Sequence, residues 1–245
     1  MEVLKEWRNK YLFKAGFALR YDEIKPETNE SLSILEYQSD RSAVFIGIQF
    51  DDVNKQPYPD EGMFFSLGAE LVLNNEVNLE EVDPETRFLE PDRDAYYQKI
   101  DLSFDKYFSM SDRLVVELGL KARLNFGSTL LDNYRIGGPN QGKNLTYGFI
   151  GLNDSELLPD SHVNLRTSLR LQLNNSFHLA PIVQLLRGSD ALSATFNRAD
   201  DLTVFGGGLL FGYDAPIGPV NFEIGFSSLR EDIVLNLGLG YRHIF

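Results

Sequence analysis

Apolar and polar side chains alternate along most of the chain with a period of two residues. The clearest segment runs from Val116 to Phe126, where every second residue is apolar. The residues between them are Glu117, Gly119, Lys121, Arg123 and Asn125. An amphipathic helix would repeat every ~3.6 residues, so this pattern predicts an extended strand with one apolar face and one polar face.

The same period predicts about ten long strands. Clear alternation covers 11–21, 63–73, 116–126, 163–173, 220–226 and 233–241, and weaker alternation covers 44–50, 100–104 and 205–213. The segment 177–187 alternates poorly and is assigned to a strand mainly from its position. Strands of globular proteins usually have about five or six residues. A tilted strand that crosses a membrane needs about nine to eleven, which matches most of these segments better.

Two all-β architectures could use such strands. A soluble sandwich or calycin-like barrel would bury the apolar stripe in one shared core, and ten long strands offer more apolar face than a chain of this size needs. We therefore predict an antiparallel transmembrane β-barrel with its apolar stripe toward lipid and its charges around a lumen. The candidate lumen charges are Glu117, Lys121, Arg123, Arg166, Arg170 and Arg242. They would form either a salt-bridge network that fills the barrel or a polar conduit and docking surface.

Long and short connections alternate between the predicted strands. The long ones are 23–41, 74–94, 127–160 and 188–201. Outer-membrane barrels have short periplasmic turns and longer external loops, so we expect a bacterial outer-membrane location with a periplasmic C-terminus. Residues 1–10 are interpreted as a lead-in and 11–245 as the barrel. The acid-rich loop 74–94 is interpreted as a solvated surface, with a divalent-ion bridge to lipopolysaccharide as the alternative.

Composition removes several classes of function. The chain of 245 residues has 23 basic and 36 acidic residues and a net charge of −13, which opposes nucleic-acid binding. It has no cysteine, so disulfides, thiol catalysis and cysteine-based zinc sites are excluded. No apolar run approaches the ~18 residues of a spanning helix. The first residues lack the apolar segment of a signal peptide, so we do not expect an uncleaved precursor.

Catalytic motifs are also missing from the sequence. There is no G-x-S-x-G, phosphate loop, H-E-x-x-H or EF-hand pattern. The histidines, His162, His178 and His243, are few and scattered, and Ser161 and His162 would point to opposite faces of a strand. We expect no enzyme activity, cofactor or metal in this chain. A catalytic His162 near the external rim is the alternative.

The chain ends with an aromatic pair on one face of the last predicted strand. Tyr241 and Phe245 are similar to the C-terminal signature of bacterial outer-membrane proteins, although His243 stands where that signature usually has an apolar residue. The resemblance implies recognition by the barrel-assembly machinery during insertion. An ordinary edge strand ending in an aromatic would be open to aggregation.

Three segments resemble the BamA/TamA superfamily. The segment Phe45–Leu71 resembles its "D…(Y/F)P..G" element, and Gly206–Ser227 resembles the hairpin before its final strand. The segment Tyr134–Leu152 is similar to the long loop that re-enters the barrel. The loop motif consists of Gly137, Gly138, Tyr147, Gly148, Phe149 and Gly151. Its Gly-Gly and Phe-x-Gly-Leu elements look most like the C-terminal barrel of patatin-like outer-membrane proteins.

Departures from the superfamily pattern bear on function. Tyr147 stands where the superfamily commonly has an arginine, and the strand 182–187 offers no aspartate to pair with one. This favours the patatin-like branch over an insertase. The family barrel has sixteen strands, so the chain would supply the last ten, or it is a divergent complete barrel. Unpaired edges in lipid are very costly, so we expect partner strands or self-closure, and a homodimer stays open.

These resemblances imply a barrel that anchors a passenger such as a patatin-like domain and takes part in its translocation or display. The alternatives are a small outer-membrane pore and a barrel-embedded hydrolase. The expected partners are outer-membrane lipid, lipopolysaccharide and the assembly machinery, and no nucleic acid. The inward-folded loop 134–152 is expected to pack Tyr147 and Phe149 against the wall around Lys121, Arg123, Arg166 and Arg170.

Overall fold

The fold is one large curved sheet. The computed structural model describes residues 2–7, 10–24, 36–54, 58–80, 96–127, 135–138, 146–153, 156–157, 159–190, 201–215 and 218–239. The described residues contain no helix long and apolar enough to cross a membrane. The eleven strands of the sheet are β1 (Glu2–Trp7), β2 (Tyr11–Ile24), β3 (Glu36–Asp51), β4 (Gly62–Glu80), β5 (Tyr97–Ser111), β6 (Leu114–Phe126), β9 (Pro159–Gln172), β10 (Phe177–Asp190), β11 (Asp201–Ala215), β12 (Gly218–Ser227) and β13 (Val234–Leu239).

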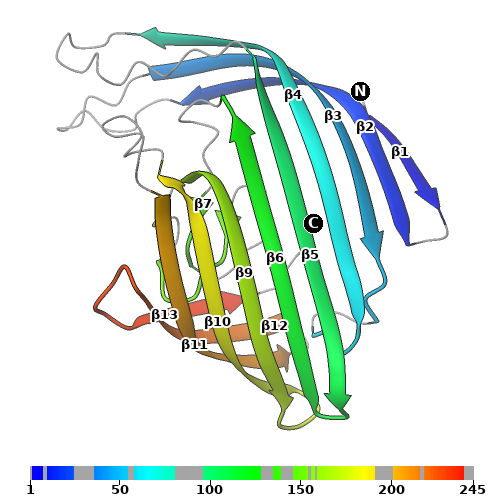
Figure 1. The fold of residues 1–245 in the computed structure, drawn as a ribbon, viewed down its shortest axis with the longest axis vertical. Helices are drawn as coiled ribbons and strands as arrows, with labels where there is room; N and C mark the ends of the chain where they lie inside the picture. The colour runs from blue at the N-terminus through cyan, green and yellow to red at the C-terminus, as the bar shows by residue number, and fades with distance from the viewer. Residues whose placement is uncertain are drawn as a thin grey trace.

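Each strand of this sheet pairs with its neighbours in the antiparallel sense, in chain order. The prediction of about ten long strands is confirmed, and β1 lies within the segment 1–10 that the sequence analysis described as a lead-in. Two short strands, β7 (Arg135–Ile136) and β8 (Thr146–Tyr147), form a separate parallel pair. Figure 1 shows β1–β6 as a broad curved wall, with β12 and β13 turned behind β9–β11.

The connections give the sheet two different ends. We call the end with the connections 52–61, 112–113, 173–176 and 216–217 the short-turn end. The opposite end, with 25–35, 81–96, 127–158 and 191–200, is the long-loop end. The connection 228–233 at the long-loop end is the short exception. The predicted alternation of connection lengths is therefore present.

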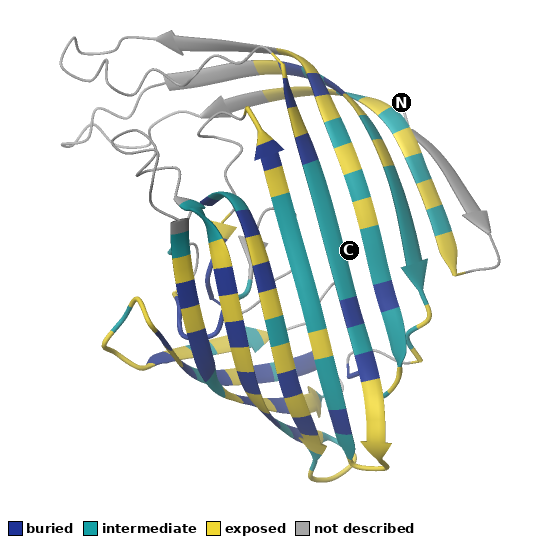
Figure 2. Ribbon diagram, viewed as in Figure 1, coloured by how far each residue is buried: buried dark blue, intermediate teal, exposed yellow. Residues whose placement is uncertain are grey.

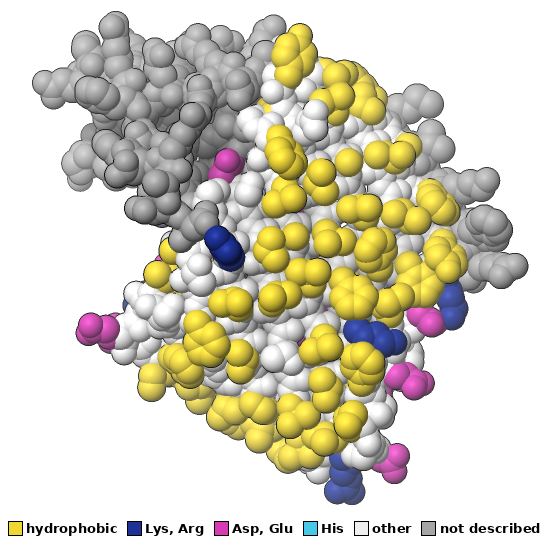
Figure 3. All heavy atoms as spheres, in the orientation of Figure 1, with side chains coloured by type: hydrophobic (Ala, Val, Ile, Leu, Met, Phe, Trp, Pro, Cys, Tyr) yellow, Lys and Arg dark blue, Asp and Glu magenta, His cyan; other side chains and the backbone are white. Residues whose placement is uncertain are grey.

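The convex face of the sheet is apolar. Leu118 and Leu169 are each 43% exposed there, whereas Arg170 on the concave face is 7% exposed. The yellow bands that cross the strands in Figure 2 and the apolar surface in Figure 3 follow this alternation. A soluble sandwich would bury the leucines and expose the arginine, so the membrane-barrel prediction is confirmed and the sandwich alternative is wrong.

Aromatic side chains lie toward both ends of the apolar face. Near the short-turn end, the rings of Tyr11 and Phe50 lie 4.9 Å apart, and those of Phe177 and Tyr213 stack at 4.6 Å. Toward the long-loop end, the exposed aromatic residues are Tyr21, Tyr96, Phe126, Phe205 and Phe226. Membrane barrels place such girdles at the two lipid–water interfaces. The aromatic positions therefore support a sheet that spans a bilayer.

Candidate functional site

The described parts of the connection between β6 and β9 fold onto the concave face (Figure 1). We call residues 135–157 the lumen loop. Ile136 and Leu157 exchange backbone hydrogen bonds of 2.8 and 3.0 Å, and the Gly138 amide donates to the Leu152 carbonyl at 3.0 Å. These bonds draw two distant parts of the loop into one compact unit.

Two glycines allow the close approaches that this unit needs. Gly137 has a φ of 132° and Gly151 a φ of 81°, in the region that side chains other than glycine rarely adopt. A Cβ at Gly151 would also collide with the backbone of Phe226 on β12. The backbone of the loop therefore lies directly against the wall of the barrel.

The lumen loop is held mainly by apolar packing. Ile136, Phe149 and Leu152 are fully buried in one cluster with Leu186 of β10 and Val204 of β11. Ile150 belongs to a second cluster with Ala180, Ile182 and Leu210. Because these wall residues all point into the concave face, β10 and β11 present the loop with an apolar surface.

Glycines of the wall leave room for the loop, and we call Gly206, Gly208 and Gly225 the glycine bed. A Cβ at Gly206 would lie 2.5 Å from the Phe149 ring, and one at Gly225 would lie 2.5 Å from the Ile150 side chain. A Cβ at Gly208 would lie 2.1 Å from the Ile224 carbonyl oxygen of β12, so this glycine also permits the close approach of β11 and β12, and 2.8 Å from Ile150 Cδ1. Real Cβ atoms do not come so close to such neighbours, so the bed is shaped to the loop.

Polar side chains complete the docking, among them Asn236 of β13, which donates to the Leu152 carbonyl at 3.3 Å. Gln184 of β10 is 2% exposed and faces the loop backbone. Its Oε1 accepts a hydrogen bond of 2.7 Å from the Ile150 amide, and its Nε2 donates to the Gly148 carbonyl at 3.3 Å. The neutral amide of Gln184 therefore satisfies one donor and one acceptor of the loop backbone. This allows the loop backbone to be buried in the lumen together with its apolar side chains.

Replacing Gln184 with leucine is expected to loosen the lumen loop. The change keeps the volume of the side chain but leaves a buried amide and a buried carbonyl without partners, at a cost of about 1–3 kcal/mol. The Ile150 amide should then exchange its hydrogen about fivefold faster or more, measured by exchange mass spectrometry or NMR in micelles. Gln172→Leu is the control, because Gln172 lies at the far end of β9. Equal exchange in the Gln184 variant and the parent would contradict this role.

A second segment enters the concave face from the short-turn end. We call residues 58–60 the turn segment, which lies between β3 and β4. Tyr58 is 8% exposed, its hydroxyl donates to Asn221 Oδ1 of β12 at 3.0 Å, and its ring lies 4.2 Å from that of His178 on β10. A Cβ at Gly212 of β11 would lie 2.7 Å from the Tyr58 hydroxyl. The turn segment therefore reaches across the lumen from β3–β4 to β10–β12.

Arg170 of β9 clamps this segment. Its guanidinium donates to the Pro59 carbonyl and to Asp60 Oδ1, the latter at 3.1 Å, and lies 5.7 Å from the centre of the Tyr58 ring. The side chain of Arg170 is only 8% exposed, so these charge-assisted bonds form away from bulk water. Strands far apart in the sheet are thereby joined through the lumen.

Comparisons with known proteins place this architecture in a family. The sequence profile of the OMP85 superfamily matches residues 3–243. The chain belongs to the OMP85 superfamily. Its structure resembles the crystal structure of BamA from Haemophilus ducreyi lacking POTRA domains 1–3, with a TM-score of 0.58 and 13% identity. The match covers 93% of this chain and 51% of that one, so the chain spans about half its length. A comparison with curated proteins gave no match.

The predicted resemblance to the BamA/TamA superfamily is thus confirmed, and this OMP85 barrel belongs in a Gram-negative outer membrane. The expected docking wall is wrong for Phe149, whereas the side chain of Tyr147 lies outside the described residues. The lumen loop packs against β10–β12 rather than against Lys121, Arg123, Arg166 and Arg170. An apolar loop surface needs an apolar wall with space for it, and the glycine bed with its apolar neighbours has both properties.

The lumen charges of this OMP85 barrel pair mostly with one another. Arg123 Nε lies 2.6 Å from Asp101 Oδ1, and Arg166 Nε lies 3.9 Å from Glu117 Oε1. Ser168 donates to Glu117 Oε2 at 2.8 Å. Lys121 lies on the same face and is partly buried. Of the predicted set, the structure brings Arg170 to the turn segment, and the pairs of Arg123 and Arg166 favour a salt-bridge network.

Several expected positions lie outside what the structure describes. These are Tyr241, Arg242, His243, Phe245 and the loop residues 81–95. Tyr147 is described by its backbone in β8 only. Sequence reasoning missed Gln184, which stands out only as a polar residue among the inward-facing Ile182 and Leu186, and it assigned no function to Tyr58. The "YP..G" motif around Tyr58 was the available signal.

The structure shows the surroundings of Ser161 and His162, the residues considered for the enzymatic alternative. His162 lies on the concave face and is 1% exposed, while Ser161 Oγ bonds with the backbone of Asn125. No group of three or more His, Asp or Glu side chains in the described part of the chain is arranged to hold a metal ion. The side chains that the structure brings together serve to dock segments in the lumen.

Proposed function

We propose that this chain is a membrane anchor with a closed lumen, which holds a passenger domain such as a patatin-like domain and takes part in its translocation or display. One observation carries the proposal: separate segments enter the lumen from both ends and dock on the same wall, β9–β12. A diffusion pore needs an open path through the lumen, and segments docked on its wall from both ends obstruct such a path.

The proposal also specifies an orientation in the membrane and the expected partners. The short-turn end would face the periplasm, and the C-terminal residues Tyr241 and Phe245 would be read by the barrel-assembly machinery. The long loops would then face lipopolysaccharide, and the net charge of −13 disfavours nucleic acid as a partner.

The two edges of the sheet bear on assembly. Among the described residues, β1 pairs only with β2, and β13 pairs only with β12. Exposed backbone donors and acceptors are very costly in lipid. We propose that these edges are closed by further strands, as the sixteen-strand family barrel implies, or by a second copy. Cross-linking in membranes would distinguish these, since only the second gives a homodimer.

The first alternative function is a small pore, and the second is a barrel-embedded hydrolase. The pore would have to conduct past the turn segment and the lumen loop. The hydrolase would need a nucleophile near His162, whose imidazole is buried in the described structure. Ester or peptide hydrolysis that is abolished by His162→Ala would favour the hydrolase.

Planar-bilayer recording tests the proposal. The protein extracted from the outer membrane is expected to show no stable ion conductance. Deletion of residues 146–153 should produce stepwise conductance, because it removes Phe149 and Ile150 from the lumen. The control lengthens the exposed turn 174–175 by two glycines, and this variant should show no stable ion conductance. Stable conductance of the unaltered protein would instead identify a pore.

A further inference from the structure

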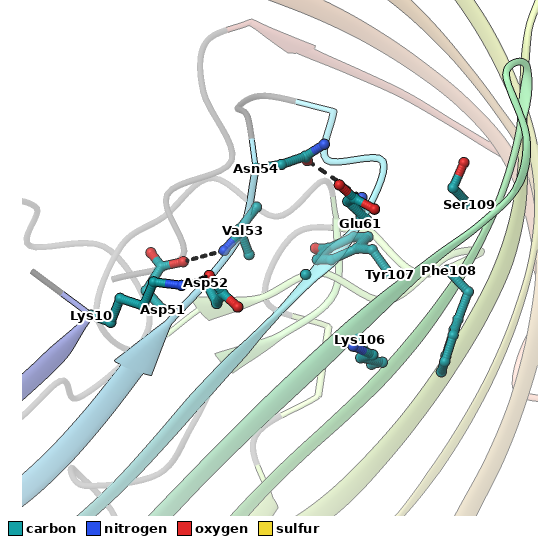
Figure 4. A pocket seen from close by; sticks show the side chains of 11 residues that line it. Lys10, Asp51, Asp52, Val53, Asn54, Glu61, Lys106, Tyr107, Phe108 and Ser109 are labelled. Atoms are coloured by element: carbon teal, nitrogen blue, oxygen red, sulfur yellow. Dashed lines mark hydrogen bonds and ion pairs between the residues drawn. The ribbon is translucent and has the colours of Figure 1, made fainter.

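A notch opens at the short-turn end, where neighbouring strands end at different heights. The first residue of β4, Gly62, pairs with Tyr107, so β5 extends past it to Ser111. Below this step lies a cavity of about 760 Å³ between the β3–β4 connection and the overhanging part of β5. Figure 4 shows Lys10 and Asp52 on one side of the notch and Lys106 and Phe108 on the other.

The notch is lined by charges of both signs. Its basic residues are Lys10 and Lys106, and its acidic residues are Asp51, Asp52 and Glu61. Lys10 forms an ion pair with Asp52, and Asp51 Oδ1 accepts a hydrogen bond of 3.0 Å from the Val53 amide. Among the described residues, neither Lys106 nor Glu61 forms an ion pair. One cation and one carboxylate are thus available to a ligand.

Lys106 is unusual because it projects from the apolar face. It pairs across the sheet with Met63 and Leu118, which belong to the lipid-facing set. Among the described side chains on the outward face of β5–β12, only Lys106 and Arg187 are charged, and Arg187 lies toward the long-loop end. A lysine in such a position extends its ammonium toward the headgroup region.

The apolar surroundings fit an acyl chain. Phe108 is 41% exposed, and the Lys106 ammonium lies 5.4 Å from the centre of its ring. A ligand that reaches Lys106 from the membrane would place its hydrocarbon part on the outward face of β5, beside Phe108 and Met110. Its polar part would enter the notch.

We propose that the notch binds the headgroup of phosphatidylethanolamine from the surrounding leaflet. Lys106 would bind the phosphate, and Glu61 would accept hydrogen bonds from the primary ammonium. Phosphatidylcholine offers the same phosphate but no N–H donor, so the notch should discriminate between them. The choice of a phospholipid rests on the proposed periplasmic position of the short-turn end. Labelling of a cysteine introduced at Asn174, in intact and in permeabilised cells, tests that orientation separately.

Native mass spectrometry of the protein extracted from the outer membrane tests the site. The probes are phosphatidylethanolamine, phosphatidylcholine and phosphatidylglycerol with identical acyl chains. Phosphatidylethanolamine should bind about tenfold more tightly than phosphatidylcholine, as expected for one charge-assisted hydrogen bond. Lys106→Gln should weaken binding of all three lipids. Glu61→Gln should remove the preference for phosphatidylethanolamine and spare phosphatidylglycerol.

Arg187→Gln is the matched control, since it removes the other outward charge and should bind all three lipids as the parent does. Glycerophosphoethanolamine, which lacks acyl chains, should not compete. Effective competition by this soluble compound would overturn the assignment of a membrane lipid. Equal binding of phosphatidylethanolamine and phosphatidylcholine, or unchanged binding by the Lys106 variant, would overturn the site itself.

Discussion

Replacement of Arg170 by methionine is expected to lower the free energy of unfolding by about 1–3 kcal/mol. The change removes the donor that holds the Pro59 carbonyl and the Asp60 carboxylate inside the lumen. The Pro59 carbonyl is buried, so its loss of a donor costs the desolvation of that group, whereas the Asp60 carboxylate is partly exposed and recovers some hydration. Guanidinium unfolding in lipid vesicles, followed by circular dichroism, would measure the loss.

The control for this variant lies on the same face of the same strand. Arg166→Met removes a guanidinium whose ion pair with Glu117 spans 3.9 Å, so it should cost less. A double-mutant cycle with Asp60→Asn isolates the coupling between Arg170 and the turn segment. Losses of equal size at Arg166 and Arg170, or a cycle with no coupling energy, would show that Arg170 does not clamp the turn.

Replacement of Gly225 by alanine is expected to release the lumen loop. The added Cβ would lie 2.5 Å from Ile150 Cγ1 and 2.6 Å from the Gly151 amide nitrogen, so the loop or strand β12 has to move. Overpacking of this kind typically costs about 1–3 kcal/mol, which shifts the ratio of docked to released loop by about fivefold or more. Conductance in planar bilayers and protease cleavage within the loop should both rise.

Gly68→Ala provides a matched comparison. Gly68 also faces the lumen, but the nearest atoms to a Cβ there lie 4.0 Å away, at ordinary contact distance. In this variant the loop should stay docked, and the barrel should show no stable ion conductance. If both alanine variants behave alike, the close fit between Gly225 and the loop does not control docking.

The turn segment and the lumen loop enter from opposite ends, so the two variants have different expected phenotypes. The Arg170 variant loosens the turn segment at the short-turn end, while the Gly225 variant loosens the lumen loop. Because the segments contact different residues of β9–β12, their effects on stability should be nearly additive. The double variant would therefore combine a lower stability with an open lumen.

Much of the fold could be predicted because its main signal is local. The alternation at Val116–Phe126 places Leu118 on the opposite face from Arg123 in any regular strand, whatever the strand pairs with. Strand length then distinguishes a membrane barrel from a soluble sandwich, and the exposed leucines agree. The weak alternation at 177–187 has a physical reason. Both faces of β10 are partly apolar, since Ile182 and Leu186 pack against the lumen loop while Val183 and Leu185 face outward.

The candidate site was predicted less completely. Its glycines and Phe149 were recognised from a motif, but the wall that receives them was placed on β6 and β9. Charge drew attention to Arg123 and Arg166, although those side chains are paired within the sheet. The true wall is defined by the missing side chains of Gly206 and Gly225 and by the amides of Gln184 and Asn236, none of which carries a signal by itself.

The sequence by itself determined the strand period, the facing of each side chain and the superfamily motifs, because these depend on residues that are close along the chain. Only the tertiary structure decided that the lumen is entered from both ends and which strands receive each segment. Tyr58 and Asn221 lie 163 positions apart, and Gln184 and Ile150 lie 34 apart. Contacts over such separations depend on how the whole sheet curves, which brings a vacant surface on one strand opposite a protruding segment from another.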